Sequence, residues 1–278
     1  MEILSPNFLR VVLDVALVLT GMSAIVLAVI VAVRFAAQAE SRRDAAFRRE
    51  TEPMVTAYLA GREKAGPVAA ALQRDPVHAL NLLMEISDRL TPEERAPLTA
   101  LFTSLPLREK EAAALQHRNW QRRLQAAGRL GYLGDGVSVP ALLDALQDPV
   151  LAVRFAAARS LAALGESRAV PQIVLAFDLP GEMNQRRVAE TLRAFGQPAV
   201  APLLAVLENV HGTYSDNAID VAARVLGMLR APEAVAPLTE LLDRSEFRVR
   251  LNAVRALGQI GDHGTADAIA QLAKDPAW

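Results

Sequence analysis

Hydrophobic and polar positions alternate along most of the chain with the spacing of amphipathic helices, but residues 15–33 are apolar without interruption. This stretch reads VALVLTGMSAIVLAVIVAV and contains no charged side chain. At ~1.5 Å per residue, a helix that also includes residues 11–13 reaches nearly the ~30 Å of a bilayer's hydrocarbon core. The pattern therefore predicts a transmembrane helix over residues 11–35, preceded by a short extracytoplasmic tail over residues 1–10. A buried helix of a soluble protein is the alternative, but such helices are seldom apolar on every face.

Positive charges are distributed unequally around this segment, which predicts its orientation. Arg10 precedes the segment, whereas the arginines after it are Arg34, Arg42, Arg43, Arg48 and Arg49. Because Lys and Arg favour the cytoplasmic side, we expect a single-pass protein of the cell (inner) membrane with its C-terminal part in the cytoplasm. A cleaved signal peptide is the competing interpretation, since Ala37-Gln38-Ala39 resembles a cleavage site. It would release a periplasmic protein after Ala39.

Small residues recur every fourth position within the apolar segment. They are Ala16, Thr20, Ala24, Ala28 and Ala32. Such a stripe lets a second transmembrane helix approach closely, so we expect these positions to support packing in the membrane. Residues 36–51 follow without Gly or Pro and predict a juxtamembrane continuation of the helix.

From about residue 119 the chain repeats with a period of about 31 residues. Gly134, Gly165 and Gly196 lie 31 residues apart, and Pro140, Pro171 and Pro202 keep the same spacing. A fourth unit has Arg230 at the glycine position and Pro237 at the proline position, and a fifth has Gly261. Glycine ends a helix cheaply and proline opens the next one, so each unit is a helix pair.

Helix pairs of this kind bury their apolar faces only by stacking, which predicts an all-α fold, an α-solenoid of five units over residues 119–278. Residues 52–118 read as degenerate helical repeats that form an N-terminal cap. Thr91-Pro92-Glu93-Glu94 is a typical helix start within them.

The phrases VRFAAARSLAALGE (153–166) and VRLNAVRALGQIGD (249–262) resemble the HEAT-repeat family, in particular the short HEAT-like repeats of phycobilisome bilin lyases. The resemblance implies that second helices line a concave groove, here mildly acidic. It also implies an Asp–Arg ladder between units, for which the candidates are Arg123, Arg154, Arg250, Asp148 and Asp243. A bilin-lyase-like or other enzyme is the second functional class. Those lyases are soluble paired subunits, however, and a membrane anchor fits that role poorly.

Composition limits the chemistry that the chain can perform. It contains no cysteine, and no two of its four histidines lie at helical metal-site spacing. The glycine-rich run GRLGYLGDG (128–136) lacks the Lys-Ser/Thr of a phosphate loop. Iron sites of the HEAT-like deoxyhypusine hydroxylases use His-Glu pairs, and the sequence has no such dipeptide. We therefore expect no catalytic residue, no cofactor and no metal site.

Charge is nearly balanced, with a net charge of -1, so its distribution matters more than its sum. The predicted first helices of the units are rich in arginine, whereas the second helices carry mostly acids. Candidate partner-binding residues on the basic face are Arg122, Arg129, Arg159, Arg186, Arg187, Arg193, Arg248 and Arg255. The lengthened loop 208–217 adds His211, Tyr214 and Asp216. Aromatic residues are not interleaved with the arginines, and no nucleic acid is expected.

These patterns together predict a membrane-anchored, non-catalytic scaffold or adaptor at the cytoplasmic face. The expected partners are the bilayer, through residues 11–35, and a membrane protein or membrane-associated enzyme. An accessory role in a glycosyltransferase or envelope-polysaccharide system is one candidate. The sequence leaves open the partner's identity, the oligomeric state, the choice between acidic groove and basic face, and whether another chain caps the C-terminus.

Overall fold

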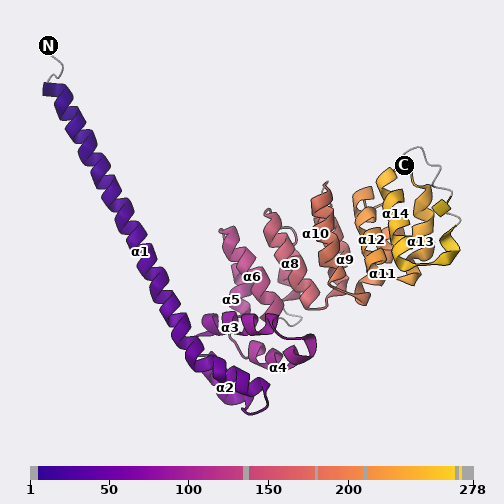
Figure 1. Cartoon of the computed structure of the whole chain (residues 1–278), viewed down its shortest axis with the longest axis horizontal. Coiled ribbons are helices and arrows are strands. Elements are labelled where there is room, and N and C mark those ends of the chain that lie inside the picture. Colours follow the sequence, from indigo (N-terminus) through magenta and orange to yellow (C-terminus); the bar gives the residue numbers. More distant parts are fainter. Residues whose placement is uncertain (1–5, 134–137, 179–180, 209–211, 267–268, 271–278) are drawn as a thin grey trace. The chain divides into compact units, whose positions relative to one another are not determined.

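The computed structural model describes residues 6–133, 138–178, 181–208, 212–266 and 269–270 (Figure 1). Within these ranges every regular element is a helix. Contacts divide the chain into two compact units, residues up to Glu85 and residues from Ile86 onward. The division falls inside helix α3 (Pro76–Asp88), between the two boundaries expected at residues 51/52 and 118/119.

The first unit is dominated by one long helix, α1 (Pro6–Leu59) (Figure 1). It continues beyond the predicted juxtamembrane segment and includes Pro53. By length and composition it is the one helix in the described ranges that could cross a membrane, and none of its most apolar stretch is buried. An unburied apolar helix of this length is compatible with a membrane anchor. Ala16, Ala24 and Ala32 are exposed along it, and the Thr20 hydroxyl donates to the Ala16 carbonyl.

The end of α1 packs with α2 (Ala65–Leu72) and α3. Val55, Val68 and Leu72 are completely buried there. Arg48 on α1 donates to Asp44 at 2.8 Å and to Glu85 at 2.5 Å. Apolar burial and these ion pairs together hold the base of the long helix against the short helices that follow it.

The second unit continues with α4 (Pro92–Thr103) and α5 (Arg108–Ala114). The Thr91 N–H donates to the Glu94 carboxylate at 2.9 Å, as the predicted helix start requires. Helix pairs then alternate. We call "first helices" the set α6 (Trp120–Leu133), α8 (Leu151–Ala163), α10 (Glu182–Arg193), α12 (Asp216–Met228) and α14 (Phe247–Ile260). The "second helices" are α7 (Val139–Ala145), α9 (Val170–Ala176), α11 (Val200–Glu208) and α13 (Val235–Glu240).

Glycine and proline mark the turn between the two helices of a unit, as predicted. Gly165 ends the first helix of its unit with φ +70, and Pro171 is the second residue of α9. In the fourth unit Arg230 stands at the glycine position and still adopts the left-handed conformation, with φ 52. The repeat therefore imposes its turn even on a side chain that disfavours it. Gly134 lies outside the described residues.

First helices of neighbouring units approach each other closely at two glycines. A Cβ added to Gly131 on α6 would lie 2.6 Å from the Ser160 Oγ on α8. One added to Gly227 on α12 would lie 2.6 Å from the Ala256 Cα on α14. A single apolar core extends from Leu115 to Leu257 beneath these helices, so the solenoid expectation is confirmed.

Candidate interaction surfaces of the solenoid

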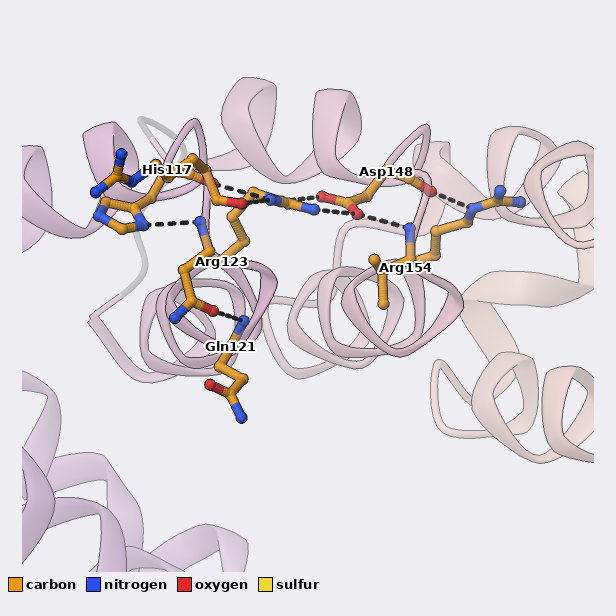
Figure 2. Close-up of polar contacts among 8 residues, drawn as sticks. His117, Gln121, Arg123, Asp148 and Arg154 are labelled. Atoms are coloured by element: carbon orange, nitrogen blue, oxygen red, sulfur yellow. Dashed lines mark hydrogen bonds and ion pairs between the residues drawn. The ribbon is translucent and has the colours of Figure 1, made fainter. Parts of the chain in front are cut away.

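A polar ladder joins the first two units (Figure 2). The Arg123 guanidinium donates to both Asp148 oxygens, at 2.6 and 3.0 Å, and Asp148 also accepts from the Val150 N–H at 2.8 Å. Arg154 donates to the Asp148 carbonyl at 2.6 Å and to the Ala176 carbonyl at 2.9 Å. Burial alone would raise the pKa of Asp148, but the hydrogen bonds from Arg123 and Val150 outweigh it and lower that pKa.

Arginines at one repeat position bond to the chain six residues earlier. Arg123 donates to the His117 carbonyl at 2.8 Å, Arg154 to that of Asp148, and Arg250 to that of Arg244 at 2.8 Å. Each arginine satisfies a carbonyl where the chain turns from one unit into the next. These side chains therefore stabilise the solenoid, as the family resemblance implies for Arg123 and Asp148. Arg154 and Arg250 perform the role mainly through main-chain carbonyls.

The basic face of the first helices is exposed at most of the predicted positions. Exposed there are Arg159, Arg186, Arg187, Arg193, Arg248 and Arg255, and Arg122 is half-buried. Arg129 differs from the expectation. It forms an ion pair with Glu111 at 2.9 Å, with side chains only 12% and 1% exposed, so it compensates a buried carboxylate inside the solenoid.

One cavity of about 480 Å³ opens on this face across α6, α8 and α10; we call it the Phe155 cavity. Its lining combines apolar Leu124, Ala156 and Phe155 with the charged groups of Arg187 and others. The Arg187 guanidinium carbon lies 4.2 Å from the centroid of the Phe155 ring, a cation–π arrangement. An apolar floor therefore lies next to a positively charged rim.

A second cavity of about 400 Å³ adjoins the first; we call it the Arg193 cavity. It is lined by Glu190 and Arg193 of α10, residues of α12, Arg230, and Gln259 of α14. Glu190 lines both cavities, so they meet at this one acidic side chain. We call the two cavities together, which are lined by residues of the first helices from α6 to α14, the trough.

A polar network between α10, α12 and α14 was not predicted from the sequence. The Gln185 side chain donates to Asn217 at 3.0 Å and accepts from Arg248 at 3.0 Å. The Asn252 amide donates to the buried Asp220, whose pKa is raised by burial. Asp220 and Asn252 stand at the repeat positions that Phe155 and Ala156 occupy in the second unit, and this change from apolar to polar is the sequence signal that could have revealed the network.

The opposite face, formed by second helices, also carries a cavity, of about 410 Å³ between α7 and α9. Asp144 is its one charged lining residue, and Leu175 stands exposed beside it. The lining of this cavity therefore offers one carboxylate, whereas the cavities on the first-helix face are lined by several guanidinium groups.

The lengthened loop 208–217, in which we expected partner-binding residues, contributes side chains to the packing of the solenoid. Tyr214 is half-buried against the apolar core, and Asp216 is exposed at the start of α12. Ser215 accepts from the Ala218 N–H at 3.3 Å and donates to Asp178 at 2.5 Å, which ties the loop to the previous unit. His211 lies outside the described residues. Across the described ranges no three His, Asp or Glu side chains are grouped to hold a metal ion.

The profile of HEAT repeats matches residues 108–182 and 206–278. The chain belongs to the HEAT-repeat family. The HEAT match begins at residue 108, so it includes α5, which the sequence pattern had left in the N-terminal cap. No curated protein sequence matches the chain.

Solved structures that match the chain include the following two. The complex of CpcE and CpcF of phycocyanin lyase from Nostoc sp. is 26% identical, with a TM-score of 0.35, over 60% of this chain and 68% of that chain. Human deoxyhypusine hydroxylase in complex with glycerol is 19% identical, with a TM-score of 0.28, over 76% of this chain and 94% of that one.

Proposed function

We propose that this protein is a membrane-anchored HEAT-repeat scaffold that binds a protein partner through its first-helix face and catalyses no reaction. The observation that carries the proposal is the trough of two adjoining cavities on the exposed basic face. Protein interfaces combine an apolar centre with a polar rim, and the lining of these cavities contains both kinds of group.

The anchor is the second part of the proposal. The apolar stretch of α1 is unburied, and arginines follow it, which supports a retained span with the solenoid on the cytoplasmic side. The helix continues without a break through Ala39, where a signal peptide would be cleaved. The His78 Nε2 lies 3.3 Å from the Glu40 carboxylate, so the helix just beyond Ala39 is held by its own unit.

The chain has no cysteine, and its topology can therefore be tested with single introduced thiols. Ser5→Cys and Ser245→Cys variants are labelled in intact cells with a membrane-impermeant maleimide. We expect Ser5→Cys to react and Ser245→Cys to react only after lysis. Labelling of Ser245→Cys in intact cells would contradict the cytoplasmic placement, and a mature N-terminus after Ala39 would contradict the anchor.

The binding face is tested by purifying the full chain with its partner in mild detergent. Arg186→Glu together with Arg187→Glu should abolish co-purification of the partner, because both side chains are exposed on α10. The matched control is Lys110→Glu with Arg244→Glu, which reverses two exposed charges outside that face. Equal recovery of the partner by both double variants would remove the first-helix face from consideration. Unchanged helicity and thermal unfolding show that the variants are folded.

Identifying the co-purified protein by mass spectrometry tests the remaining part of the proposal. We expect a membrane protein or membrane-associated enzyme, with a glycosyltransferase or envelope-polysaccharide component as the specific candidate. Recovery of soluble proteins alone would contradict an accessory role in a membrane assembly.

A further inference from the structure

We propose that the trough on the first helices binds a short, extended acidic segment of the partner protein, with an apolar side chain in the Phe155 cavity and a carboxylate in the Arg193 cavity. This inference rests on the proposed function, since it names the part of the partner that the first-helix face recognises.

The Phe155 cavity suits an apolar side chain. Its lining includes Leu124, Ala156 and Phe155, and the Phe155 ring is itself supported by Phe177, with ring centroids 4.4 Å apart. The Phe155 side chain is only 5% exposed, because Phe177 and the Arg187 guanidinium lie against its ring, so the accessible apolar lining comes mainly from Leu124, Ala152 and Ala156. An aliphatic or aromatic side chain entering here would exchange water for contact with a rigid apolar floor.

The Arg193 cavity suits a carboxylate. Arg193 and Arg230 both line it, and in the described part of the chain neither guanidinium has a carboxylate partner. A planar guanidinium binds a carboxylate by two parallel hydrogen bonds, which favours Asp or Glu over other groups. Arg230 also adopts a left-handed backbone conformation at the end of α12, next to the cavity.

The two cavities predict a spacing for the bound segment. Packed helices lie ~8–10 Å apart, and the cavities flank α10 on either side. An extended chain advances ~3.3 Å per residue. Dividing ~8–10 Å by ~3.3 Å per residue places the acidic residue about three positions from the apolar one.

Glu190 distinguishes this occupant from other anionic partners. Because it stands where the cavities meet, a continuous polyanion such as nucleic acid would place charge directly against its carboxylate. An anionic bilayer would likewise present headgroups over Glu190. A peptide avoids the conflict by having an uncharged or basic residue between its apolar and acidic positions.

The test uses the full chain in phosphatidylcholine nanodiscs and fluorescein-labelled ten-residue peptides of Gly and Ser. Each peptide carries one Leu and one Asp-Glu pair, and the number of residues between them varies from one to six. Fluorescence polarisation should show the tightest binding when Leu and the nearer acidic residue are about three positions apart, that is, with two residues between them. Replacing Asp-Glu by Lys-Lys should abolish it. Equal binding at every spacing, binding of the Lys-Lys series, or no binding by any peptide would overturn the inference.

Three variants assign the cavities. Arg193→Glu should weaken the best peptide at least tenfold, and Ala156→Phe should remove the preference for Leu over Ala by filling the Phe155 cavity. The Glu190→Gln variant should bind the best peptide more tightly than the native chain does. It should also still bind a peptide that carries Asp between the Leu and the acidic pair. The Lys110→Glu and Arg244→Glu double variant should bind as the native chain does. If Glu190→Gln leaves affinity and tolerance unchanged, the acid does not select the occupant, and the inference fails.

The outcome is separable from that of the proposed function. Suppose that the Arg186→Glu and Arg187→Glu double variant loses the partner in co-purification, but the native chain binds none of the peptides. This result would support the scaffold proposal and overturn the proposal that the trough binds an acidic segment. Preferential binding to phosphatidylserine nanodiscs or to a single-stranded oligonucleotide, blocked by Arg193→Glu, would overturn it in favour of that polyanion.

Discussion

Two glycines on α6 provide a direct test of how closely the first helices approach. Gly128 and Gly131 lie on the same helix, and neither has a positive φ. A Cβ at Gly128 would meet no atom within 4 Å. A Cβ at Gly131 would lie 2.6 Å from the Ser160 Oγ and 3.0 Å from its Cα. Alanine at either position therefore adds the same methyl group to the same helix, but only at position 131 does that group meet a neighbouring helix.

The two substitutions are expected to change the free energy of unfolding in opposite directions. Alanine in place of a helical glycine stabilises by roughly 0.5–1 kcal/mol, so Gly128→Ala should raise stability by that amount. Gly131→Ala receives the same gain, but overpacking against α8 costs typically ~1–3 kcal/mol. Ser160 has little freedom to move, because it is buried and its hydroxyl donates to the Ala127 carbonyl at 2.7 Å. We expect a net loss of about 1–2 kcal/mol for Gly131→Ala.

Thermal unfolding of the full chain in detergent, followed by circular dichroism, measures both effects. For a unit of this size 1 kcal/mol shifts Tm by roughly 2–4 °C. Gly128→Ala should therefore unfold a few degrees higher and Gly131→Ala a few degrees lower than the native protein. The double variant with Gly131→Ala and Ser160→Gly should lose less stability than the sum of the losses of the two single variants, because it lacks the Ser160 side chain that the new methyl group would contact. A Gly131→Ala variant as stable as Gly128→Ala would refute the close approach of α6 and α8.

Three further predictions concern strain and titration. Arg230→Gly should raise Tm by a few degrees, which corresponds to about 0.5–1 kcal/mol in the free energy of unfolding. The reason is that a backbone φ of 52 is unfavourable for arginine but not for glycine. A lower Tm would refute the backbone strain at Arg230. Burial and the hydrogen bond to Asp88 at 2.6 Å raise the pKa of Tyr132 to about 12, so its phenolate absorbance should appear near that pH. Its contribution to stability is present below pH ~10 and lost as the pH rises towards 12, and Tyr132→Phe should abolish that part of the alkaline Tm decrease. The lowered pKa of Asp148 means that its contribution is present above pH ~4 and lost in acid. Asp148→Asn should therefore lower Tm at neutral pH, by about 1–3 kcal/mol of stability, and weaken the acid dependence; an unchanged acid profile would contradict the ion pair.

The candidate surface was predictable in kind but not in detail. Arginine enrichment of the first helices indicated a basic face, and six of the eight predicted positions are exposed there. The sequence could not show that Arg129 turns to Glu111, because the carboxylate that requires compensation lies on α5, outside the repeat that was aligned. Nor could it show that Glu190 joins two cavities, since a cavity depends on the separation of helices that are far apart along the chain.

Local rules and tertiary packing therefore determine different parts of this protein. The period of about 31 residues, the glycine and proline positions and the uninterrupted apolar segment specified the helix pairs and the long first helix, because helix length, helix ends and amphipathicity depend on neighbours a few residues away. Which arginines remain free for a partner was decided only when the units stacked. Burial of Glu111 and Asp148 drew Arg129 and Arg123 into the structure, since a charge removed from water must be paired. In the described part of the chain, Arg193 and Arg230, which line a cavity with Glu190, are exposed and have no carboxylate partner.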